Sequence, residues 1–209
     1  MRNSPEIVGA PNKLTKTHFG LFRHGQTDWN INFLLQGVTD IPMNATGIEQ
    51  VRTASKVISR DDWDIVITSP LGRARQSAEI IAEQSGFEEI LTLDLLIERS
   101  FGEAEGLDYD QWKAKYSSLD EIPGGESRTD LIQRSQALLD TIEKSHPGKR
   151  ILAISHGALI RTLLSISSNN ELPRNGERLG NASLNIVSHL DSAWSVTKYD
   201  LEPLSPRDP

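Results

Sequence analysis

The chain has 209 residues, of which 37% are hydrophobic and 24% are charged, and its formal net charge is −7 at pH 7. This balance is typical of a soluble globular domain, and no apolar run is long enough to span a membrane. The negative charge opposes binding to nucleic acid or anionic lipid, because the long-range field repels polyanions. The sequence has no cysteine, which excludes a thiolate nucleophile and a cysteine-ligated metal site.

The two ends of the chain are expected to lie outside a single domain. Residues 1–16 lack the apolar stretch of a secretory signal, so we expect a flexible N-terminal leader and a cytoplasmic protein. Residues 17–200 are expected to form the domain, and the proline-containing residues 201–209 to form a C-terminal tail. The absence of cysteine also fits a reducing compartment.

The first third of the chain predicts a strand, a helix and a second strand. Residues 17–23, THFGLFR, are partly apolar and lead towards a glycine, which suits a strand that enters a loop. Residues 44–60 place apolar side chains close to helical spacing, with Asn44 or Thr46 available as the cap. The mainly apolar run WDIVITS at 63–69 is typical of a parallel strand that is buried on both faces.

The order of strand and helix then repeats. A helix is expected to begin near Pro70 and to stop at Gly86, followed by a strand at 89–94. The next stretch contains several glycines and a proline, so we expect a long loop or a small helical insert there. Residues 127–146 predict the next helix, and RILAIS at 150–155 predicts another buried strand.

The last elements complete an alternating pattern. Residues 157–166 predict a helix, and residues 183–188 and 194–199 predict two weaker strands. Strands that alternate with helices indicate an α/β fold, here a three-layer α/β/α sandwich with a mostly parallel central sheet and right-handed crossovers.

Three of the predicted strands or their following loops carry distinctive residues at their carboxyl ends. These are RHG at 23–25, SPLGRAR at 69–75 and SHG at 155–157. Ligands of open α/β sheets bind at this edge, so the three motifs are expected to meet there. Taken singly, each motif also has an explanation without a function. A histidine before glycine fits a simple turn, and arginines on an early helical turn are commonly solvated.

Five motifs in this order resemble the histidine phosphatase superfamily, in its phosphoglycerate mutase-like branch. They are FRHGQTDWN, LQGVTDIPMNATG, TSPLGRARQSAE, IERSFGEAEG and ISHGALIR, and together they extend over most of the chain. The ordered set is specific, although RHG alone occurs by chance in many proteins. The fold that the resemblance implies, a phosphoglycerate mutase-like α/β sandwich, agrees with the fold predicted from periodicity.

The resemblance assigns the catalytic roles to five residues. It implies that His24 is the nucleophile that becomes phosphorylated and that Glu98 is the proton donor. It also implies that Arg23, Arg73 and His156 hold the phosphoryl oxygens. This chemistry is coherent, because a guanidinium forms forked hydrogen bonds to phosphate and a neutral ring nitrogen can attack phosphorus when a backbone carbonyl fixes the tautomer. A bound dianion would favour the imidazolium form of His156 and the protonated form of Glu98.

Further residues are expected to bind the substrate or to support the site. The resemblance implies that Asn30 assists in phosphoryl binding, and Gln36 lies in a loop where substrate contacts are common in the family. Gly157 begins the predicted helix after His156, where backbone N–H groups and the helix dipole favour an anion. Asn181 resembles a late asparagine of the family, and we expect its role to be structural.

Two alternatives concern the acidic residues. By position alone, Glu98 is interpretable as an exposed glutamate paired with its neighbour Arg99, and only the surrounding motif favours the catalytic role. Glu105 is a rival carboxylate, although Ala104 replaces the aromatic residue that usually precedes it in the family. Glu98 is the predicted acid.

The expected activity is hydrolysis of a phosphomonoester by an enzyme of the histidine acid phosphatase type. The substrate is expected to be a small phosphorylated metabolite, with no metal, no other cofactor, no nucleic acid and no membrane as partner, and a homodimer is left open. The interval from Glu98 to His156 is only 58 residues and lacks the adjacent arginine pair of the mutases. A cofactor-dependent phosphoglycerate mutase is the alternative, since ERSFG resembles the mutase motif, and an inactive binding or regulatory module is the second alternative.

Overall fold

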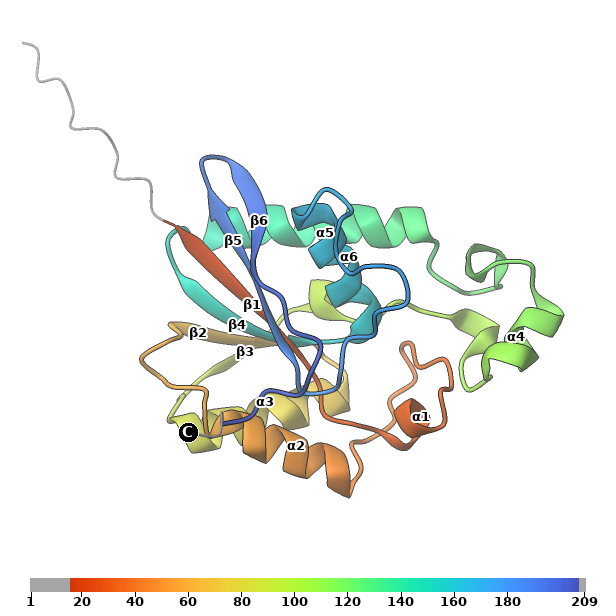
Figure 1. Ribbon diagram of the computed structural model, residues 1–209, viewed down its shortest axis with the longest axis horizontal. Coiled ribbons are helices and arrows are strands. Elements are labelled where there is room, and N and C mark those ends of the chain that lie inside the picture. Colours follow the sequence, from red (N-terminus) through yellow and green to blue (C-terminus); the bar gives the residue numbers. More distant parts are fainter. Residues whose placement is uncertain (1–15, 207–209) are drawn as a thin grey trace, which may run out of the picture.

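Six strands form one mixed sheet in the computed structural model, which describes residues 16–206. The strands follow one another in space in the order β3-β2-β4-β1-β5-β6 (Figure 1). The three pairs among β1 to β4 are parallel, and β5 is antiparallel to both of its neighbours. Their bounds are β1 Thr17–Arg23, β2 Ile65–Thr68, β3 Ile90–Thr92, β4 Arg150–Ser155, β5 Leu184–Leu190 and β6 Ala193–Lys198.

Four long helices cover the two faces of the sheet, which confirms the expected α/β sandwich. Helices α2 (Ala45–Ser55) and α3 (Gly72–Ser85) lie together on one face, and α5 (Arg128–Ser145) and α6 (Gly157–Ser167) lie on the other (Figure 1). Shorter pieces occur in the connections: α1 Asp28–Ile31, α4 Tyr109–Lys115 and the 3₁₀ turns η1 Asp94–Leu96, η2 Gly102–Ala104 and η3 Leu119–Glu121.

The alternation of side chains along the central strands divides the core into two halves. In β4, Ile151 and Ala153 pack under α5 and α6, whereas Leu152 and Ile154 pack under α2 and α3. All four side chains are fully buried, which explains the continuous apolar run in the sequence. Burial of each of the three larger ones, Ile151, Leu152 and Ile154, contributes about 1.5–3 kcal/mol.

Local signals explain most of the helix ends. The side chain of Asn44 accepts a hydrogen bond from the Gly47 N–H, so Asn44 rather than Thr46 caps α2. Gly86 ends α3 in the left-handed conformation, with φ 74°. The helix itself begins at Gly72, two residues after Pro70, because Leu71 is still extended. Strands β2 and β3 are shorter than expected by a few residues at their ends.

The stretch between β3 and α5 contains a small helical insert, one of the two forms expected for it. Its helix α4 lies at the side of the molecule, away from the sheet (Figure 1). The insert has its own apolar cluster, formed by Ala104, Trp112 and Ile122. It is joined to the remainder by the loop after α1, since Leu35 N–H donates to the Leu107 carbonyl at 2.9 Å.

The structure describes residues of the expected C-terminal tail but only Lys16 of the expected leader. Residues 1–15 of the leader lie outside the described part of the chain. Within the tail, Leu201 packs against the cluster under α6 and Leu204 packs against the cluster under α2. Backbone hydrogen bonds also join both leucines to the 180–182 loop: Gly180 N–H donates to the Leu201 carbonyl, and Leu204 N–H donates to the Ala182 carbonyl. In the described residues, 16–206, no helix has the length and apolar character needed to cross a membrane.

Candidate active site

His24 directly follows β1 at the carboxyl edge of the sheet. Its side chain is 2% exposed, and its Nδ1–H donates to the Gly25 carbonyl at 2.7 Å. This bond assigns the tautomer, because a carbonyl can only accept, and it leaves the lone pair on Nε2. Burial, together with the charges of Arg73 and Arg23, holds the pKa of His24 well below its ordinary value. The ring is therefore neutral at neutral pH.

His156 directly follows β4, the strand next to β1. The ring centroids of His24 and His156 are 5.1 Å apart, with an interplanar angle of 56°. Its Nε2 is 2.7 Å from Ser69 Oγ, and its Nδ1 is buried without a partner. Burial is the main cause that lowers the pKa of His156 well below its ordinary value, and the nearby charge of Arg73 adds to it. Without a bound anion, this histidine is neutral as well.

Two arginines, of which Arg73 is fully buried and Arg23 is partly buried, lie beside the histidines. Arg73 is fully buried, and its Nη1 and Nη2 donate to the carbonyls of Thr39 and Gly37 at 3.0 and 2.7 Å. Arg23 donates from Nη1 to the Leu179 carbonyl. Burial lowers the pKa of Arg23 to about 10, so the guanidinium still carries its charge at neutral pH. Backbone carbonyls thus fix both cations without neutralising them.

Several buried side-chain nitrogens of this region have no hydrogen-bond partner within the described residues. They are Arg23 Nε, Arg73 Nε, Gln36 Nε2 and His156 Nδ1. Buried polar groups are nearly always hydrogen-bonded, and an unpartnered group in a native fold calls for an explanation such as a ligand. Three of these atoms belong to the residues expected to hold phosphoryl oxygens, and the fourth belongs to an expected substrate contact.

Glu98 lies between η1 and η2 and is 5% exposed. Its carboxylate accepts hydrogen bonds from Ala158 and Leu159 N–H at 3.0 and 3.1 Å, in the first turn of α6. Its charge acts on Arg23 and Arg73, for both of which it raises the pKa against the effect of burial. The alternative of an exposed Glu98–Arg99 pair is wrong, because Glu98 is buried and the Arg99 guanidinium pairs instead with Asp120 at 2.6 Å.

A network of amide side chains supports the loop after His24. Asn30 Nδ2 donates to Gln36 Oε1 at 2.9 Å, and Thr27 Oγ1 donates to the same oxygen at 2.9 Å. Asn181 Nδ2 donates to the His24 carbonyl and to Asn30 Oδ1, each at 3.0 Å. The geometry therefore links Asn30 and Gln36 to the site through each other, and Asn181 holds the backbone of His24.

Gly157 begins α6 directly beside Arg23. A β-carbon on Gly157 would lie 3.5 Å from Arg23 Nε, which is ordinary van der Waals contact. Two N–H groups of the first turn of α6 donate hydrogen bonds to the Glu98 carboxylate. The carboxylate and Arg23 therefore both lie at the N-terminal end of α6. Gly157 thus lies where the backbone, Glu98 and Arg23 converge.

Glu105, the rival carboxylate, fixes a loop instead of facing the histidines. It accepts hydrogen bonds from Val38 and Thr39 N–H at 2.9 and 2.7 Å, from the Thr39 hydroxyl and from Phe101 N–H at 3.1 Å. Burial alone would raise the pKa of Glu105, but these hydrogen bonds outweigh burial and lower it. Since Thr39 supplies a carbonyl to Arg73, Glu105 positions the arginine indirectly.

Two serines of the site were not predicted from the sequence. Ser69 Oγ contacts His156, and Ser77 Oγ accepts a hydrogen bond from Gly25 N–H at 3.2 Å. Both serines lie in the motif TSPLGRARQSAE, so a hydroxyl at a strand end and one on the next helix were visible signals. Arg75 of the same motif is exposed, in contrast to Arg73.

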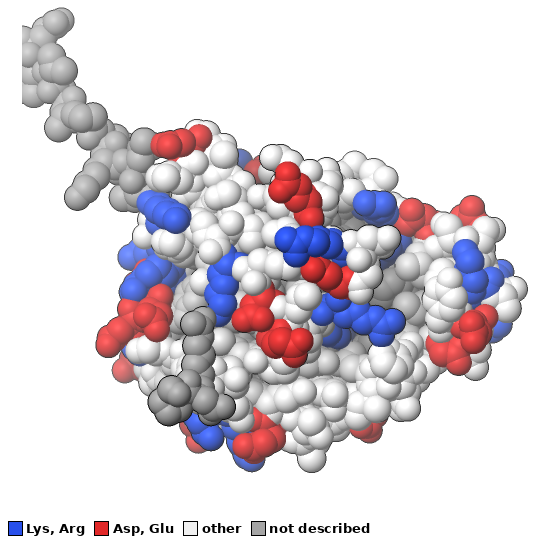
Figure 2. All heavy atoms as spheres, in the orientation of Figure 1, with Lys and Arg blue, Asp and Glu red and all other residues white. Residues whose placement is uncertain are grey.

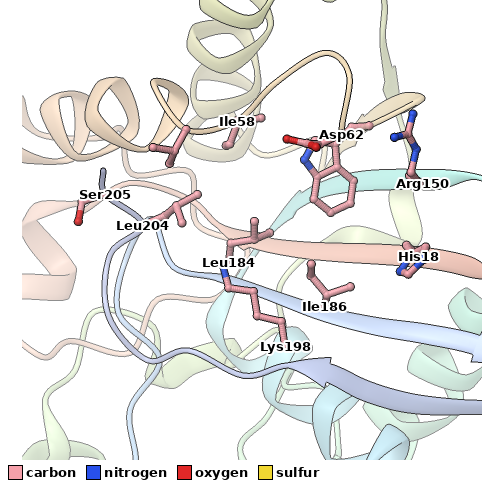
Figure 3. A pocket seen from close by; sticks show the side chains of 11 residues that line it. His18, Ile58, Asp62, Arg150, Leu184, Ile186, Lys198, Leu204 and Ser205 are labelled. Atoms are coloured by element: carbon pink, nitrogen blue, oxygen red, sulfur yellow. The ribbon is translucent and has the colours of Figure 1, made fainter. Parts of the chain in front are cut away.

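A separate cavity of about 510 Å³ lies on the sheet face that α2 covers. Figure 3 shows it between Ile58 and Asp62 on one side and Leu184, Ile186 and Lys198 on the other. None of the predicted site residues lines this cavity, so its size does not make it the reaction centre. Within residues 16–206, no group of three metal-ligating side chains comes together.

Comparison with known proteins agrees with the geometry. The family model described as histidine phosphatase superfamily (branch 1) matches residues 19–202. The chain is 37% identical to the uncharacterized phosphatase PhoE of Bacillus subtilis (strain 168), over 87% of this chain and 93% of that protein. It is 34% identical to the probable phosphoglycerate mutase GpmB of Serratia proteamaculans (strain 568), over 87% and 89%.

Solved structures give the same assignment. A mycobacterial glucosyl-3-phosphoglycerate phosphatase is 25% identical, with a TM-score of 0.77 over 90% of this chain and all of that one. Since the family model and relatives above 30% identity both cover most of the chain, the chain belongs to branch 1 of the histidine phosphatase superfamily.

Proposed function

We propose that the protein is a phosphomonoesterase of the histidine acid phosphatase type, which hydrolyses a small phosphorylated metabolite through a phosphohistidine on His24. The observation that carries the proposal is the neutral, tautomer-fixed His24 ring beside buried side-chain nitrogens that lack partners. A nucleophile with a free lone pair and an unfilled set of anion contacts fit a phosphoryl group between them.

In the first step, His24 Nε2 attacks phosphorus and the bond from phosphorus to the ester oxygen breaks. Arg23, Arg73 and His156 stabilise the charge on the three transferring oxygens. With the ester bound, Glu98 acts in its protonated form and gives its proton to the leaving alkoxide. A dianion next to His156 favours its imidazolium form, so the unpartnered Nδ1 can donate to the bound group.

In the second step, water attacks the phosphohistidine and the nitrogen–phosphorus bond breaks. Glu98, now ionised, takes the proton from the attacking water, so inorganic phosphate leaves and the starting protonation state returns. Asn30 and Gln36 complete the wall near the transferred group, and Gly157 contributes the start of α6. No metal and no other cofactor enters the scheme, since the charges come from side chains.

A mutase is the second candidate, and one observation favours it. The relatives that match include the probable phosphoglycerate mutase GpmB, and the motif ERSFG resembles the mutase form. The relation to a protein called a phosphatase is at higher identity, 37% against 34%, and only 58 residues separate Glu98 from His156. We therefore place hydrolysis first. An inactive module is less well supported, because all five catalytic residue types are present.

The test has two parts. Incubation with 3-phosphoglycerate and 2,3-bisphosphoglycerate should release inorganic phosphate, whereas rapid formation of 2-phosphoglycerate without phosphate release would establish the mutase instead. The variant His24→Ala should lose at least about 10³-fold of 4-nitrophenyl phosphate hydrolysis, as expected when a nucleophile is removed. Unchanged turnover in this variant would show that His24 is not the nucleophile.

A further inference from the structure

A groove of about 660 Å³ runs along the outer side of α6, next to the candidate active site. Its walls come from the start of α5, one side of α6, the segment after Glu98 and the loop after α6. The residues used below are Arg99, Arg128, Leu131, Ile132, Ala158 and Arg161.

The groove opens at the same helix end that holds the catalytic carboxyl. Ala158 lines the groove, and its N–H donates to Glu98 Oε2 at 3.0 Å. Burial is the main cause that lowers the pKa of Arg23, and the charges of Arg73 and Arg161 add to this effect. Arg161 lies about one helical turn after Gly157, which is directly beside Arg23, so the groove adjoins the proposed phosphoryl site.

The lining of the groove is cationic. Three arginines and no aspartate or glutamate line it, in a protein whose net charge is −7. Arg99 is paired with Asp120, but among the described residues no ion pair holds the Arg128 or Arg161 side chain. Arg161 Nη1 donates to the Glu177 carbonyl at 2.6 Å, a neutral partner. Figure 2 shows basic side chains bordering a hollow where the α5 and α6 side of the molecule faces the α4 insert.

We propose that Arg128 and Arg161 bind a second anionic group of the substrate, a carboxylate or a phosphate, while its ester phosphate lies against His24. This inference rests on the proposed function, and it narrows the substrate to phosphomonoesters that carry a further negative charge. Leu131 and Ile132 supply an apolar wall for the carbon skeleton between the two anions. Guanidinium groups suit this task, because they remain charged and form paired hydrogen bonds with planar carboxylates.

The test compares phenyl phosphates that carry different groups at the 4-position. They are 4-carboxyphenyl phosphate and its neutral amide analogue 4-carbamoylphenyl phosphate, with 4-(phosphonomethyl)phenyl phosphate as the phosphate-like arm. The wild type should prefer the charged ester by about fivefold in kcat/KM, as for an ion pair in a groove that is open to solvent. A preference for the carboxylate arm or for the phosphonate arm identifies which anion the groove takes.

The variants Arg161→Gln and Arg128→Gln should each reduce this ratio towards 1, and Arg128→Glu should bring it below 1. Arg52→Gln, on the exposed side of α2, is the matched control and should keep the wild-type ratio. Circular dichroism establishes that each variant is folded. A wild-type ratio near 1 for both charged arms, or an unchanged ratio in the arginine variants, would overturn the inference.

Binding separates this inference from the proposed function. In His24→Ala the ester remains intact, so calorimetry gives the ratio of Kd values for the charged and neutral esters directly. The same fivefold preference is expected there, with the same loss in the double variants that add Arg161→Gln or Arg128→Gln. A binding preference without hydrolysis by the wild type would contradict the phosphatase and leave the groove assignment standing. Hydrolysis by the wild type without any preference for the charged esters would support the phosphatase and contradict the groove assignment.

Discussion

The two buried histidines make the stability of the protein depend on pH. His24 and His156 are neutral in the folded state because burial and nearby arginines lower their pKa values well below 6.5. In the unfolded chain both titrate near that ordinary value. The unfolded state therefore binds more protons below pH 6.5, and the free energy of unfolding falls as the pH is lowered. Above pH 6.5 this contribution to stability is fully present.

The size of the effect follows from the linkage relation. Between pH 7.5 and pH 5.5, a histidine that remains neutral in the folded state costs about 1.4 kcal/mol of the free energy of unfolding. The two together cost about 2.7 kcal/mol. A typical domain is stable by about 5–15 kcal/mol, so this loss is a large and measurable fraction.

The assay is urea unfolding followed by circular dichroism at pH 7.5, 6.5 and 5.5. His24→Asn removes one titrating ring and keeps a side-chain N–H for the Gly25 carbonyl. Its loss of stability over the two pH units should be smaller than that of the wild type by about 1.4 kcal/mol. Ser77→Ala is the matched control, since it removes a buried hydrogen bond to Gly25 and no titrating group, and it should lower stability by the same amount at every pH. Equal pH dependence in the wild type and His24→Asn would refute the neutral, buried state of His24.

Two further substitutions test the supports of the site. Arg73→Lys keeps the charge, but a lysine cannot reach both the Thr39 and Gly37 carbonyls while it holds an anion. The value of kcat/KM for 4-nitrophenyl phosphate should therefore fall about 10- to 100-fold. Steady-state rates within twofold of the wild type would contradict this role. Glu105→Gln should lower the free energy of unfolding at pH 7 by about 1–3 kcal/mol, because the 38–39 loop loses its ionised acceptor. Since the folded pKa of Glu105 is lowered, urea titrations should show the gap to the wild type closing as the pH falls below the ordinary value of 4.5.

The main elements of the fold were predictable where local pattern and tertiary packing agree. Strands β1 and β4 have the expected bounds, because each apolar run ends at a histidine that leaves the sheet. Helix α1 was not predicted, since four residues show no helical periodicity. It exists through a reciprocal cap between Thr27 and Asn30. The start of α3 was displaced by a contact from far along the chain, because Asp40 accepts the hydrogen bond of Gly72 N–H at 2.8 Å.

The candidate site also has a part that the sequence predicts and a part that depends on tertiary contacts. The sequence predicted that His24 and His156 each end a strand at the same edge of the sheet. The structure adds that these strands, β1 and β4, are neighbours and that the two rings lie together. No periodicity could show that Glu98 caps α6 or that Glu105 binds the loop around Thr39, because these bonds depend on how irregular segments cross in space. The contact of Ser69 with His156 also depends on the register between β2 and β4.

The position of β1 in the sheet has a consequence for synthesis of the protein. This strand is the first to leave the ribosome, yet its two neighbours are β4 and β5, which begin at residues 150 and 184. Until those segments emerge, its apolar side chains and both backbone edges have no native partner in the sheet. Nascent or truncated chains that end before residue 150 therefore expose an unpaired apolar strand, a feature that favours aggregation. The loop after β1 can take its final shape only after β5, which begins at residue 184, has also been made.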